Sequence, residues 1–343
     1  MVDIIAHTAI LIKQQIEDDD ISLYHSKKMK DLTFLKLITP TNLASEKRKF
    51  FKDKKYNPVF SYIWQKASTE NYEASSASRR KLLEAIFSQN EKEIVASAQK
   101  HFQTTISKSY IELAKELTSK RPSMRFKPNP EGFKHKFERA LKFFGIDYDV
   151  ILAHEHGYNY RPKHKHHQLW VSKFGHRDFF SLDGSVKHEM VHVIRAINGE
   201  FNGIVKSENF LPTEEGLACL MQDYYGRYPK ASRFQHAAEY LASQVGLRGS
   251  LRDIYQLLRF LGFPKNLAWQ RSVRHKFGFV DSSKAGDIMK PAMYFHHEQK
   301  LKSLSKDKRL RLFVGKISVS DLDSYKTYNG QIAKDKIIKF FKL

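Results

Sequence analysis

A short motif near the middle of the chain constrains both its local fold and its chemistry. The sequence HEMVH at residues 188–192 places two histidines four positions apart around a glutamate. On an α-helix, such residues lie about 40° apart around the axis and one turn along it, so both imidazoles can reach one ion. The motif therefore predicts a helix with two zinc ligands, His188 and His192, and a general base, Glu189, on the neighbouring face.

The flanking sequence is consistent with a helix at this position. Ser181, Asp183 or Ser185 can cap its N-terminus, and Asn198-Gly199 is typical of a left-handed helix stop. The alternative is a surface helix that carries the motif by chance in a chain with 16 histidines. Composition alone puts a chance match at roughly four in a hundred, so a third ligand is needed to support the metal site.

The segment LPTEEGLACL, residues 211–220, offers that ligand. Thr213 can cap a second helix that begins with Glu214 and Glu215, and Gly216 would let this helix approach the first closely. Acids are also favoured at helix N-termini by the macrodipole, which is the ordinary interpretation of the pair. Joined to the motif upstream, a glutamate early in the following helix completes the three protein ligands of a catalytic zinc site.

The early part of the chain is expected to be helical. Apolar residues recur three and four positions apart in residues 7–20, 78–102 and 108–120. Thr41 or Asn42 can cap a further helix.

Three prolines, Pro122, Pro128 and Pro130, interrupt this pattern and mark the best candidate boundary. We therefore expect a helical N-terminal region, residues 1–125, packed with a catalytic domain, residues 126–343.

Beyond the prolines the sequence pattern changes from helical spacing to short runs typical of strands. Residues 148–154 and 167–174 carry β-branched and aromatic residues over strand-length windows, which predicts two short strands. Helical spacing returns in residues 232–246, 250–263 and 333–343. The expected fold is α+β and predominantly helical, with a small sheet beside the motif helix.

Composition limits the location and partners of the protein. Its single cysteine, Cys219, excludes an internal disulfide and a cysteine-based zinc site, and fits a reducing, cytoplasmic compartment. We expect neither a secretory signal nor a membrane span. The formal charge of +22 favours acidic partners, but lysine-rich runs are commonly solvated faces. Since no nucleic-acid-binding motif accompanies the charge, nucleic acid is not the expected partner.

The sequence resembles the DUF1704 family, which includes the microtubule-associated tyrosine carboxypeptidases. The matching pieces occur in order along most of the chain: LITPTNLASEKRKFFKDKKYNPVFSY (37–62), HEMVHVIRAING (188–199), LPTEEGLACL (211–220), DSSKAGDIMKPAMYF (281–295) and LFVGKI (312–317). Each piece is short, but their common order is specific.

This resemblance implies a gluzincin-like zinc metallopeptidase. His188 and His192 would be ligands of Zn2+, Glu189 the general base and Glu215 the third ligand. Characterised eukaryotic members of the family remove the C-terminal tyrosine of α-tubulin, so the implied partner is an acidic protein tail such as that of tubulin.

The chain departs from the family at two positions. Two residues separate Glu189 from His192 where the family has three, and Pro291 stands where the family has aspartate. The i, i+4 spacing is the commoner zinc geometry, so metal binding is still expected, whereas the family's substrate specificity does not carry over directly.

Further site residues follow from the resemblance and from the chemistry of peptide hydrolysis. Tyr294 matches the family's tyrosine and is the candidate donor to the oxyanion, although it is also one of 16 tyrosines that can simply pack in a core. The candidates for binding a substrate carboxylate are Lys290, Arg271, Arg274 and Arg195. Arg195 has a structural alternative, in which it orients a ligand carboxylate.

The sequence thus predicts a zinc metallopeptidase, with carboxypeptidase activity on acidic tails as the first interpretation. An endopeptidase or aminopeptidase of other specificity is the second. The third is a basic binding protein with a vestigial metal site. The histidine-rich stretch RPKHKHHQ, residues 161–168, lacks helical i, i+4 spacing and is expected to be an exposed basic loop.

Overall fold

The computed structural model describes residues 33–66, 76–122, 129–154, 160–173, 182–204, 206–207, 209–225 and 229–343. The chain forms two compact units, each made of two separate stretches of sequence. The first comprises Met1–His101 and Val245–Ile288, and the second comprises Phe102–Gln244 and Met289–Leu343. The expected boundary near residue 125 and the expected helix at residues 7–20 lie outside the described residues and stay predictions.

The described residues of the first unit form helices and one isolated β-bridge, between Val59 and Asp281. Its elements are α3 (Phe34–Ile38), α4 (Leu43–Lys52), η2 (Ile63–Lys66), α5 (Ala77–Ser88), α6 (Glu91–His101), α12 (Leu251–Phe260) and α13 (Lys265–His275). Asn42 stands at the N-cap of α4, as expected, but its side chain does not cap the helix. Its amide instead bonds to the backbone of Val59 and Ser61, because an asparagine can hold a neighbouring loop as readily as a helix end.

The second unit combines helices with the sheet. Its helices are α7 (Lys108–Thr118), α8 (Pro130–Phe144), α9 (Leu182–Phe201), α10 (Phe210–Tyr225), α11 (Pro229–Gly246, which ends in the first unit), α14 (Lys290–Lys302), α15 (Lys306–Arg311), η4 (Leu312–Val314), η5 (Val319–Ser324) and α16 (Lys334–Phe341). The predicted α+β, mostly helical fold class is confirmed. No helix among the described residues is long and apolar enough to cross a membrane.

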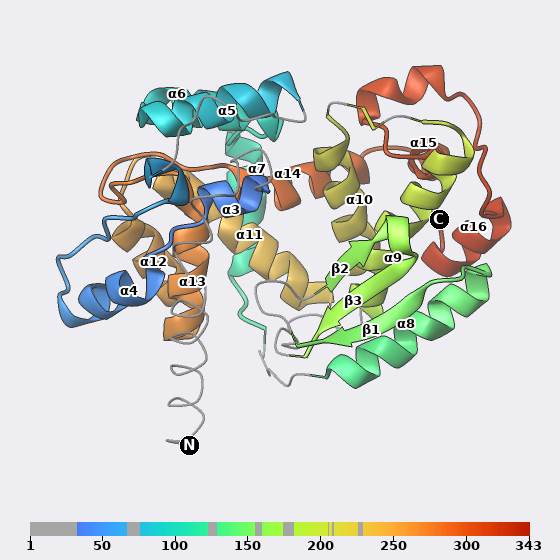
Figure 1. Cartoon of the computed structure of the whole chain (residues 1–343), viewed down its shortest axis with the longest axis horizontal. Helices are drawn as coiled ribbons and strands as arrows, with labels where there is room; N and C mark the ends of the chain where they lie inside the picture. The colour runs from blue at the N-terminus through green and yellow to red at the C-terminus, as the bar shows by residue number, and fades with distance from the viewer. Residues whose placement is uncertain are drawn as a thin grey trace. The chain divides into compact units, whose positions relative to one another are not determined.

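The sheet has three strands, β1 (Asp149–Ala153), β2 (Tyr160–Lys163) and β3 (Gln168–Ser172), in the order β1-β3-β2. β1 runs parallel to β3, and β2 runs antiparallel to it (Figure 1). The predictions of β1 and β3 are confirmed. β2 was expected to be loop, and that expectation is wrong because an edge strand tolerates Pro162.

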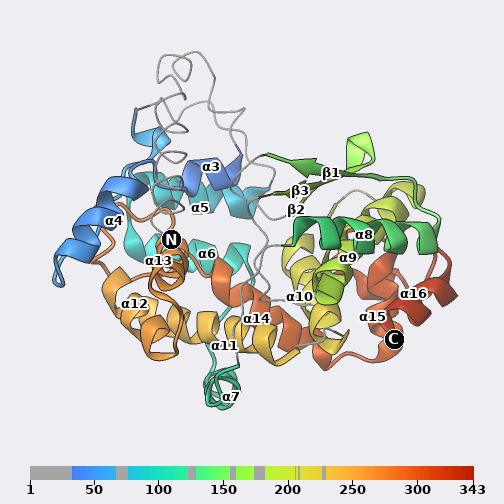
Figure 2. The same cartoon turned by 90° about the horizontal axis from the view of Figure 1, so that it is seen from below.

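Helices α8 and α9 lie beside this sheet and share one apolar core with it (Figure 2). α8 contributes Phe133 and Phe137, β3 contributes Leu169 and Val171, and α9 contributes Met190 together with other buried residues. The apolar positions of α9 face this core, so the intervening polar positions of the motif fall on its other side.

Two expected helix boundaries are wrong, both for tertiary reasons. Asn198-Gly199 does not stop α9, which continues to Phe201. The Asn198 amide is used within the fold, since it donates to the carbonyl of Phe313 and accepts from the Ile332 amide. α10 begins at Phe210, so Thr213 lies inside it, and its hydroxyl accepts a hydrogen bond from Val319 N.

Candidate metal centre

Helices α9 and α10 bring together three side chains predicted as metal ligands. His188, His192 and Glu215 each offer a donor atom, and these atoms all lie within 4.8 Å of one another. Nε2 of His188 lies 3.6 Å from Oε2 of Glu215, and Nε2 of His192 lies 3.9 Å from the same oxygen. Two imidazoles and one carboxylate are the donor set of a catalytic zinc site with an open fourth position.

The Nδ1 atoms of the two histidines contact side-chain oxygens of α10. Nδ1 of His188 lies 2.9 Å from Oε1 of Gln222, and Nδ1 of His192 lies 3.5 Å from Oε2 of Glu214. Both acceptors favour a proton on Nδ1, which leaves the Nε2 lone pairs directed at the shared space beside Glu215. The residues present therefore fit a zinc ion, because metal-binding histidines commonly donate their other N–H to such a partner.

Glu189, the predicted general base, belongs to the same helix as His188 and His192. It follows His188 on α9 and is only 9% exposed. Burial raises the pKa of its carboxyl group, against the lowering effect of the two histidines. A carboxylate with a raised pKa is suited to take up a proton and pass it on near neutral pH.

Charge is strongly coupled around His192 in the metal-free protein. Burial would lower the pKa of His192, but the carboxylates of Glu214, Glu215 and Glu189, with Glu214 first, together outweigh that effect and raise the pKa to about 9. Burial would raise the pKa of the Glu214 carboxyl group. The nearby cationic groups of His192, Lys316 and Arg195 outweigh burial and hold that pKa well below its usual range. Glu214 is thus a buried, ionised carboxylate beside the ligand set.

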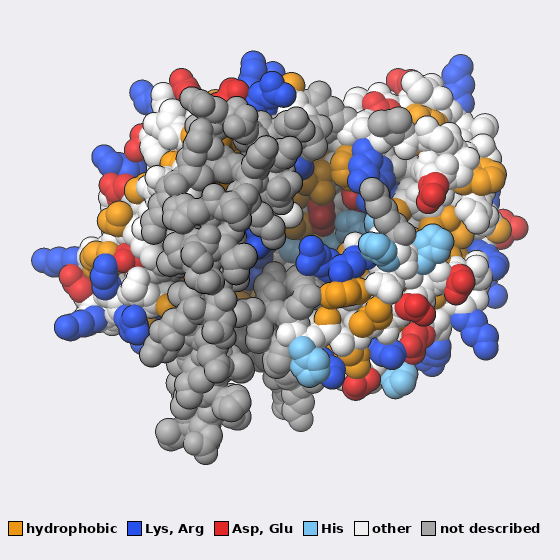
Figure 3. Space-filling view, in the orientation of Figure 1, with side chains coloured by type: hydrophobic (Ala, Val, Ile, Leu, Met, Phe, Trp, Pro, Cys, Tyr) orange, Lys and Arg blue, Asp and Glu red, His pale blue; other side chains and the backbone are white. Residues whose placement is uncertain are grey.

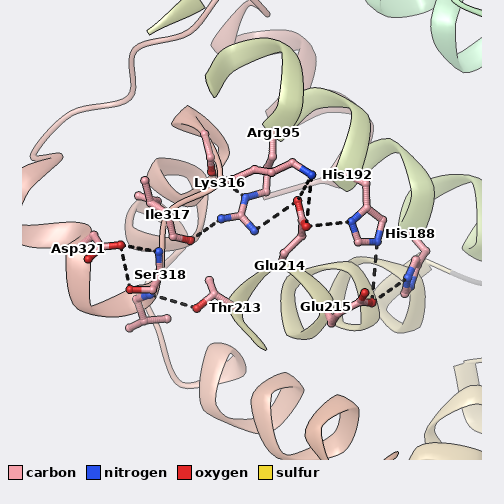
Figure 4. Close-up of polar contacts among 12 residues, drawn as sticks. His188, His192, Arg195, Thr213, Glu214, Glu215, Lys316, Ile317, Ser318 and Asp321 are labelled. Carbon is pink, nitrogen blue, oxygen red and sulfur yellow. Dashed lines mark hydrogen bonds and ion pairs between the residues drawn. The ribbon is translucent and has the colours of Figure 1, made fainter. Parts of the chain in front are cut away.

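Arg195 is fully buried on α9, at 0% exposure. Its Nε donates to the carbonyl of Gly315 at 2.9 Å, its Nη2 donates to that of Ile317 at 2.5 Å, and its Nη1 lies 3.9 Å from Oε1 of Glu214 (Figure 4). The carboxylate beside Arg195 is thus that of Glu214 and not that of the predicted ligand Glu215, so the alternative that Arg195 orients a ligand carboxylate stays a prediction. A role in binding a substrate carboxylate stays a prediction.

The other predicted substrate and catalytic residues lie on two helices. Tyr294 and Lys290 belong to α14 in the second unit and are half-buried, with the Tyr294 ring centroid 6.0 Å from that of His236. Arg271 and Arg274 belong to α13 in the first unit and are also half-buried. Their proposed roles stay predictions.

Two polar partners of the site, Gln222 and Lys316, were not expected from the sequence, and Glu214 was expected only as an alternative to Glu215 at the start of the second helix. Gln222 had no signal beyond its spacing, seven positions after Glu215 on the same helix face. Lys316 belongs to LFVGKI, one of the pieces that resemble the family, but the resemblance did not indicate which residue it contacts. Its Nζ lies 3.3 Å from Oε1 of Glu214.

The histidine-rich stretch divides into two parts. His166 and His167 are exposed, as expected of a basic loop. His164 is half-buried instead, with Nδ1 3.2 Å from the Tyr148 hydroxyl. Burial, followed by the charge of Lys316, lowers the pKa of His164 to about 4, so its imidazole is uncharged at neutral pH.

Comparison with curated proteins confirms the resemblance to the microtubule-associated tyrosine carboxypeptidases. The chain is 24% identical over 340 residues to "Microtubule-associated tyrosine carboxypeptidase 1" of Mus musculus, covering 92% of this chain and 67% of that protein. It is 26% identical over 306 residues to the Homo sapiens protein of the same name, covering 83% and 60%. It is 28% identical over 303 residues to "Putative tyrosine carboxypeptidase MATCAP2" of Homo sapiens, covering 87% and 47%. The chain thus spans between 47% and 67% of the length of these relatives. No family model matches the chain.

Proposed function

We propose that this chain is a zinc-dependent carboxypeptidase that removes one C-terminal residue from acidic protein tails. The observation that carries the proposal is the convergence of His188, His192 and Glu215 on one space, with Glu189 next to His188 in the sequence of α9. The names of the relatives support the carboxypeptidase class. The single buried cysteine and the word "microtubule-associated" in those names support a cytoplasmic location.

The reaction follows from the roles of the side chains. Zn2+ held by His188, His192 and Glu215 would supply Lewis-acid polarisation of the scissile carbonyl and a water of lowered pKa. Glu189 accepts the proton of the attacking water and delivers it to the leaving amine. Gln222 and Glu214 contact the Nδ1 atoms of His188 and His192 and so orient the rings with Nε2 toward the space beside Glu215, where an ion would be held.

Two further tasks need donors from elsewhere in the chain. The oxyanion needs a hydrogen-bond donor, for which Tyr294 is the candidate because a phenol donates without adding charge. The free carboxylate of the substrate needs a cation, for which Lys290, Arg271 and Arg274 are the candidates. We assign these roles as proposals that rest on the family resemblance.

The choice of acidic tails, with that of tubulin as the first test, rests on charge and on the relatives. The chain carries 59 basic and 37 acidic residues, which would attract a polyanionic tail toward it. On the face drawn in Figure 3, Lys and Arg side chains are interspersed with Asp and Glu. The attraction is therefore expected to act as general steering, with its strength falling as salt concentration rises.

The decisive experiment exposes the zinc-loaded protein to a defined peptide mixture and identifies every product by mass spectrometry. The mixture contains acidic tails ending in tyrosine or phenylalanine, the same tails with an amidated C-terminus, and peptides with internal tyrosines. We expect loss of a single C-terminal residue from the free-carboxylate tails only. Glu189→Gln is the matched control, because it keeps the ligands and the size of the base.

Other products would identify the other functions considered. Internal cleavage would indicate an endopeptidase, and trimming from the amino end would indicate an aminopeptidase. If no peptide and no tubulin is cleaved while the protein binds zinc, the carboxypeptidase proposal fails and a binding protein with a non-catalytic metal site is the better description.

A further inference from the structure

The segment 313–318, which we call the C-terminal arm, lies along helix α9 and is held there by side chains of that helix. Asn198 donates to the carbonyl of Phe313 at 2.8 Å, and Asn202 donates to that of Val314 at 2.9 Å. Arg195 donates to the carbonyls of Gly315 and Ile317. The arm is not a strand, so these side chains satisfy backbone carbonyls that would otherwise be buried without partners.

The approach of the arm to α9 depends on two glycines. A Cβ added to Gly315 would lie 3.0 Å from the Cα of Gly199 and 2.8 Å from the Cδ1 of Ile204. A Cβ added to Gly199 would lie 3.4 Å from the Cα of Gly315. The backbones of the arm and helix therefore meet almost directly, which defines the position of the residue that follows Gly315.

That residue is Lys316, and its ammonium group reaches the buried carboxylate of Glu214. Nζ lies 3.3 Å from Oε1 and 3.5 Å from Oε2 of Glu214, whose side chain is only 3% exposed. Two nitrogen atoms from α9 also lie near the carboxylate oxygens of Glu214. Nη1 of Arg195 lies 3.9 Å from Oε1, and Nδ1 of His192 lies 3.5 Å from Oε2. Figure 4 shows Glu214 lying between Arg195 and His192.

A second anchor holds the far end of the arm at α10. The amide of Val319 donates to Thr213 Oγ1 at 3.1 Å, and Ser318 forms a capping box with Asp321 at the start of η5. Thr213 directly precedes Glu214 in sequence. The arm is thus attached on both sides of Lys316, to α9 before it and to α10 after it.

We propose that the C-terminal arm is part of the metal centre, in which Lys316 and Arg195 hold the Glu214 carboxylate and Glu214 positions His192 as a ligand. The three sequence pieces HEMVHVIRAING, LPTEEGLACL and LFVGKI are thereby linked by one chain of contacts, which runs from Lys316 through Glu214 to the predicted ligand His192. A carboxylate with two cations behind it keeps one oxygen directed at Nδ1 of His192, which fixes the ring and its tautomer. Glu214 is in this sense a positioning residue, with no contact to substrate.

The test measures zinc affinity in the full-length chain by competition with a chromophoric chelator. Lys316→Met and Glu214→Gln are each expected to weaken zinc binding by about 10- to 100-fold, the range found for partners of metal-binding histidines. Lys316→Arg should restore most of the affinity because it keeps the cation. Lys326→Met, at an exposed position a few residues beyond the arm, is the matched control and should bind zinc like the unmodified chain.

The double variant decides whether Lys316 acts through Glu214. In the Glu214→Gln background, Lys316→Met should cause little further loss of affinity, since the group it holds is already neutral. Losses that multiply in the double variant would overturn the proposal, as would an unchanged affinity in either single variant. If Lys316→Met alone does not fold, the comparison of Glu214→Gln with the double variant still tests the coupling, because neither contains an unpaired buried carboxylate.

The Co2+ form gives a readout that a purely structural role would not change. A rotated His192 alters the ligand field, so the visible spectrum of the cobalt-loaded Glu214→Gln variant should differ in shape from that of the unmodified chain. An identical spectrum at full occupancy would overturn the positioning role. The inference rests on the proposed metal centre but not on its activity, so a chain that binds zinc and cleaves nothing would refute the proposed function while leaving this test intact.

Discussion

Gly216 and His297 are in direct contact through their backbones, where α10 packs against α14. A Cβ added to Gly216 would lie 2.6 Å from the Cβ of His297 and 3.0 Å from its carbonyl oxygen. Gly216 was expected to bring α10 close to the motif helix, and the close approach instead occurs at α14. The position of Glu215, one residue earlier, therefore depends on how tightly α10 and α14 pack.

Gly216→Ala should destabilise the protein although alanine favours helices by about 1 kcal/mol over glycine. The contact with His297 Cβ cannot be relieved by rotating a side chain, so we expect a loss of about 1–3 kcal/mol in the free energy of unfolding. Urea denaturation measures the change. Ala96→Gly, at an exposed helical position, provides the ordinary helix propensity for comparison. Stabilisation by Gly216→Ala would contradict the packing described.

Removing the metal should abolish peptide hydrolysis and lower the melting temperature. Zinc at 100 times its dissociation constant stabilises a folded protein by about 2.7 kcal/mol. Thermal unfolding with chelator and with added zinc measures this shift. In His188→Ala and Glu215→Ala, zinc should no longer raise the melting temperature; a full zinc-dependent shift in both would show that the ion binds elsewhere.

The stability of the metal-free protein should fall as pH rises from about 6.5 toward 9. The pKa of His192 is raised to about 9 in the folded state by the nearby carboxylates, Glu214 foremost, against the effect of burial; in an unfolded chain it is about 6.5. The protonated histidine therefore stabilises the fold fully below pH 6.5, and that contribution, about 3 kcal/mol, is lost as pH rises through 9. Chemical denaturation across this range measures it.

The matching comparison uses Glu214→Gln, which removes the charge that raises the pKa of His192. Its metal-free form should show a much flatter dependence on pH over the same interval. Zinc affinity should change in the opposite direction, since the ion competes with the proton on His192 and binds more tightly as pH rises. Equal pH slopes in both proteins would disprove the coupling.

Tyr294→Phe should lower kcat by about 100- to 1000-fold, the loss typical of one oxyanion donor, with little change in KM. The zinc affinity and the melting temperature should stay close to those of the unmodified chain, because only a hydroxyl is removed. Steady-state kinetics on a cleaved peptide provides the measurement. Tyr325→Phe is the control for the loss of a tyrosine hydroxyl, and a variant of Tyr294 with full kcat would exclude the role.

Arg195→Met should reduce stability rather than substrate binding. It would leave the carbonyls of Gly315 and Ile317 without their donor and Glu214 without one cation, and breaking a buried pair typically costs about 3–5 kcal/mol. Unfolding curves and KM, measured together, separate the two roles. A higher KM with unchanged stability would instead support binding of the substrate carboxylate by Arg195.

The parts of the fold and the site that could be predicted were those that depend on the spacing of residues close together in the sequence. The i, i+4 histidines specify a helix face, and both β1 and β3 were recognisable from their β-branched and aromatic residues. Local spacing did not distinguish Glu214 from Glu215, because two adjacent acids fit the same helix start equally well. Only the family resemblance selected Glu215, and the structure places it against the two Nε2 atoms with Glu214 behind His192.

The remaining features depend on contacts between distant segments. Asn198-Gly199 has the composition of a helix stop, but the helix continues through it. The Asn198 side chain binds the C-terminal arm, and Gly199, which has no Cβ, lets the arm approach closely. Lys316 is one lysine among many in a basic chain, and only the fold identifies it as the one near Glu214. Residues 161–168 were expected to form a loop, yet β2 includes residues 161–163 and lies at the sheet edge, where Pro162 is tolerated.

The interleaving of the two units has a consequence for biosynthesis. The predicted metal ligands lie before residue 216, but Lys316 lies one hundred positions later, after the whole inserted stretch Val245–Ile288 of the other unit. A chain emerging from the ribosome can form α9 and α10 long before the arm exists, since folding during synthesis proceeds from the N-terminus. If the arm is required for tight zinc binding, the nascent chain acquires its metal, and with it any proteolytic capacity, only when translation has passed the arm.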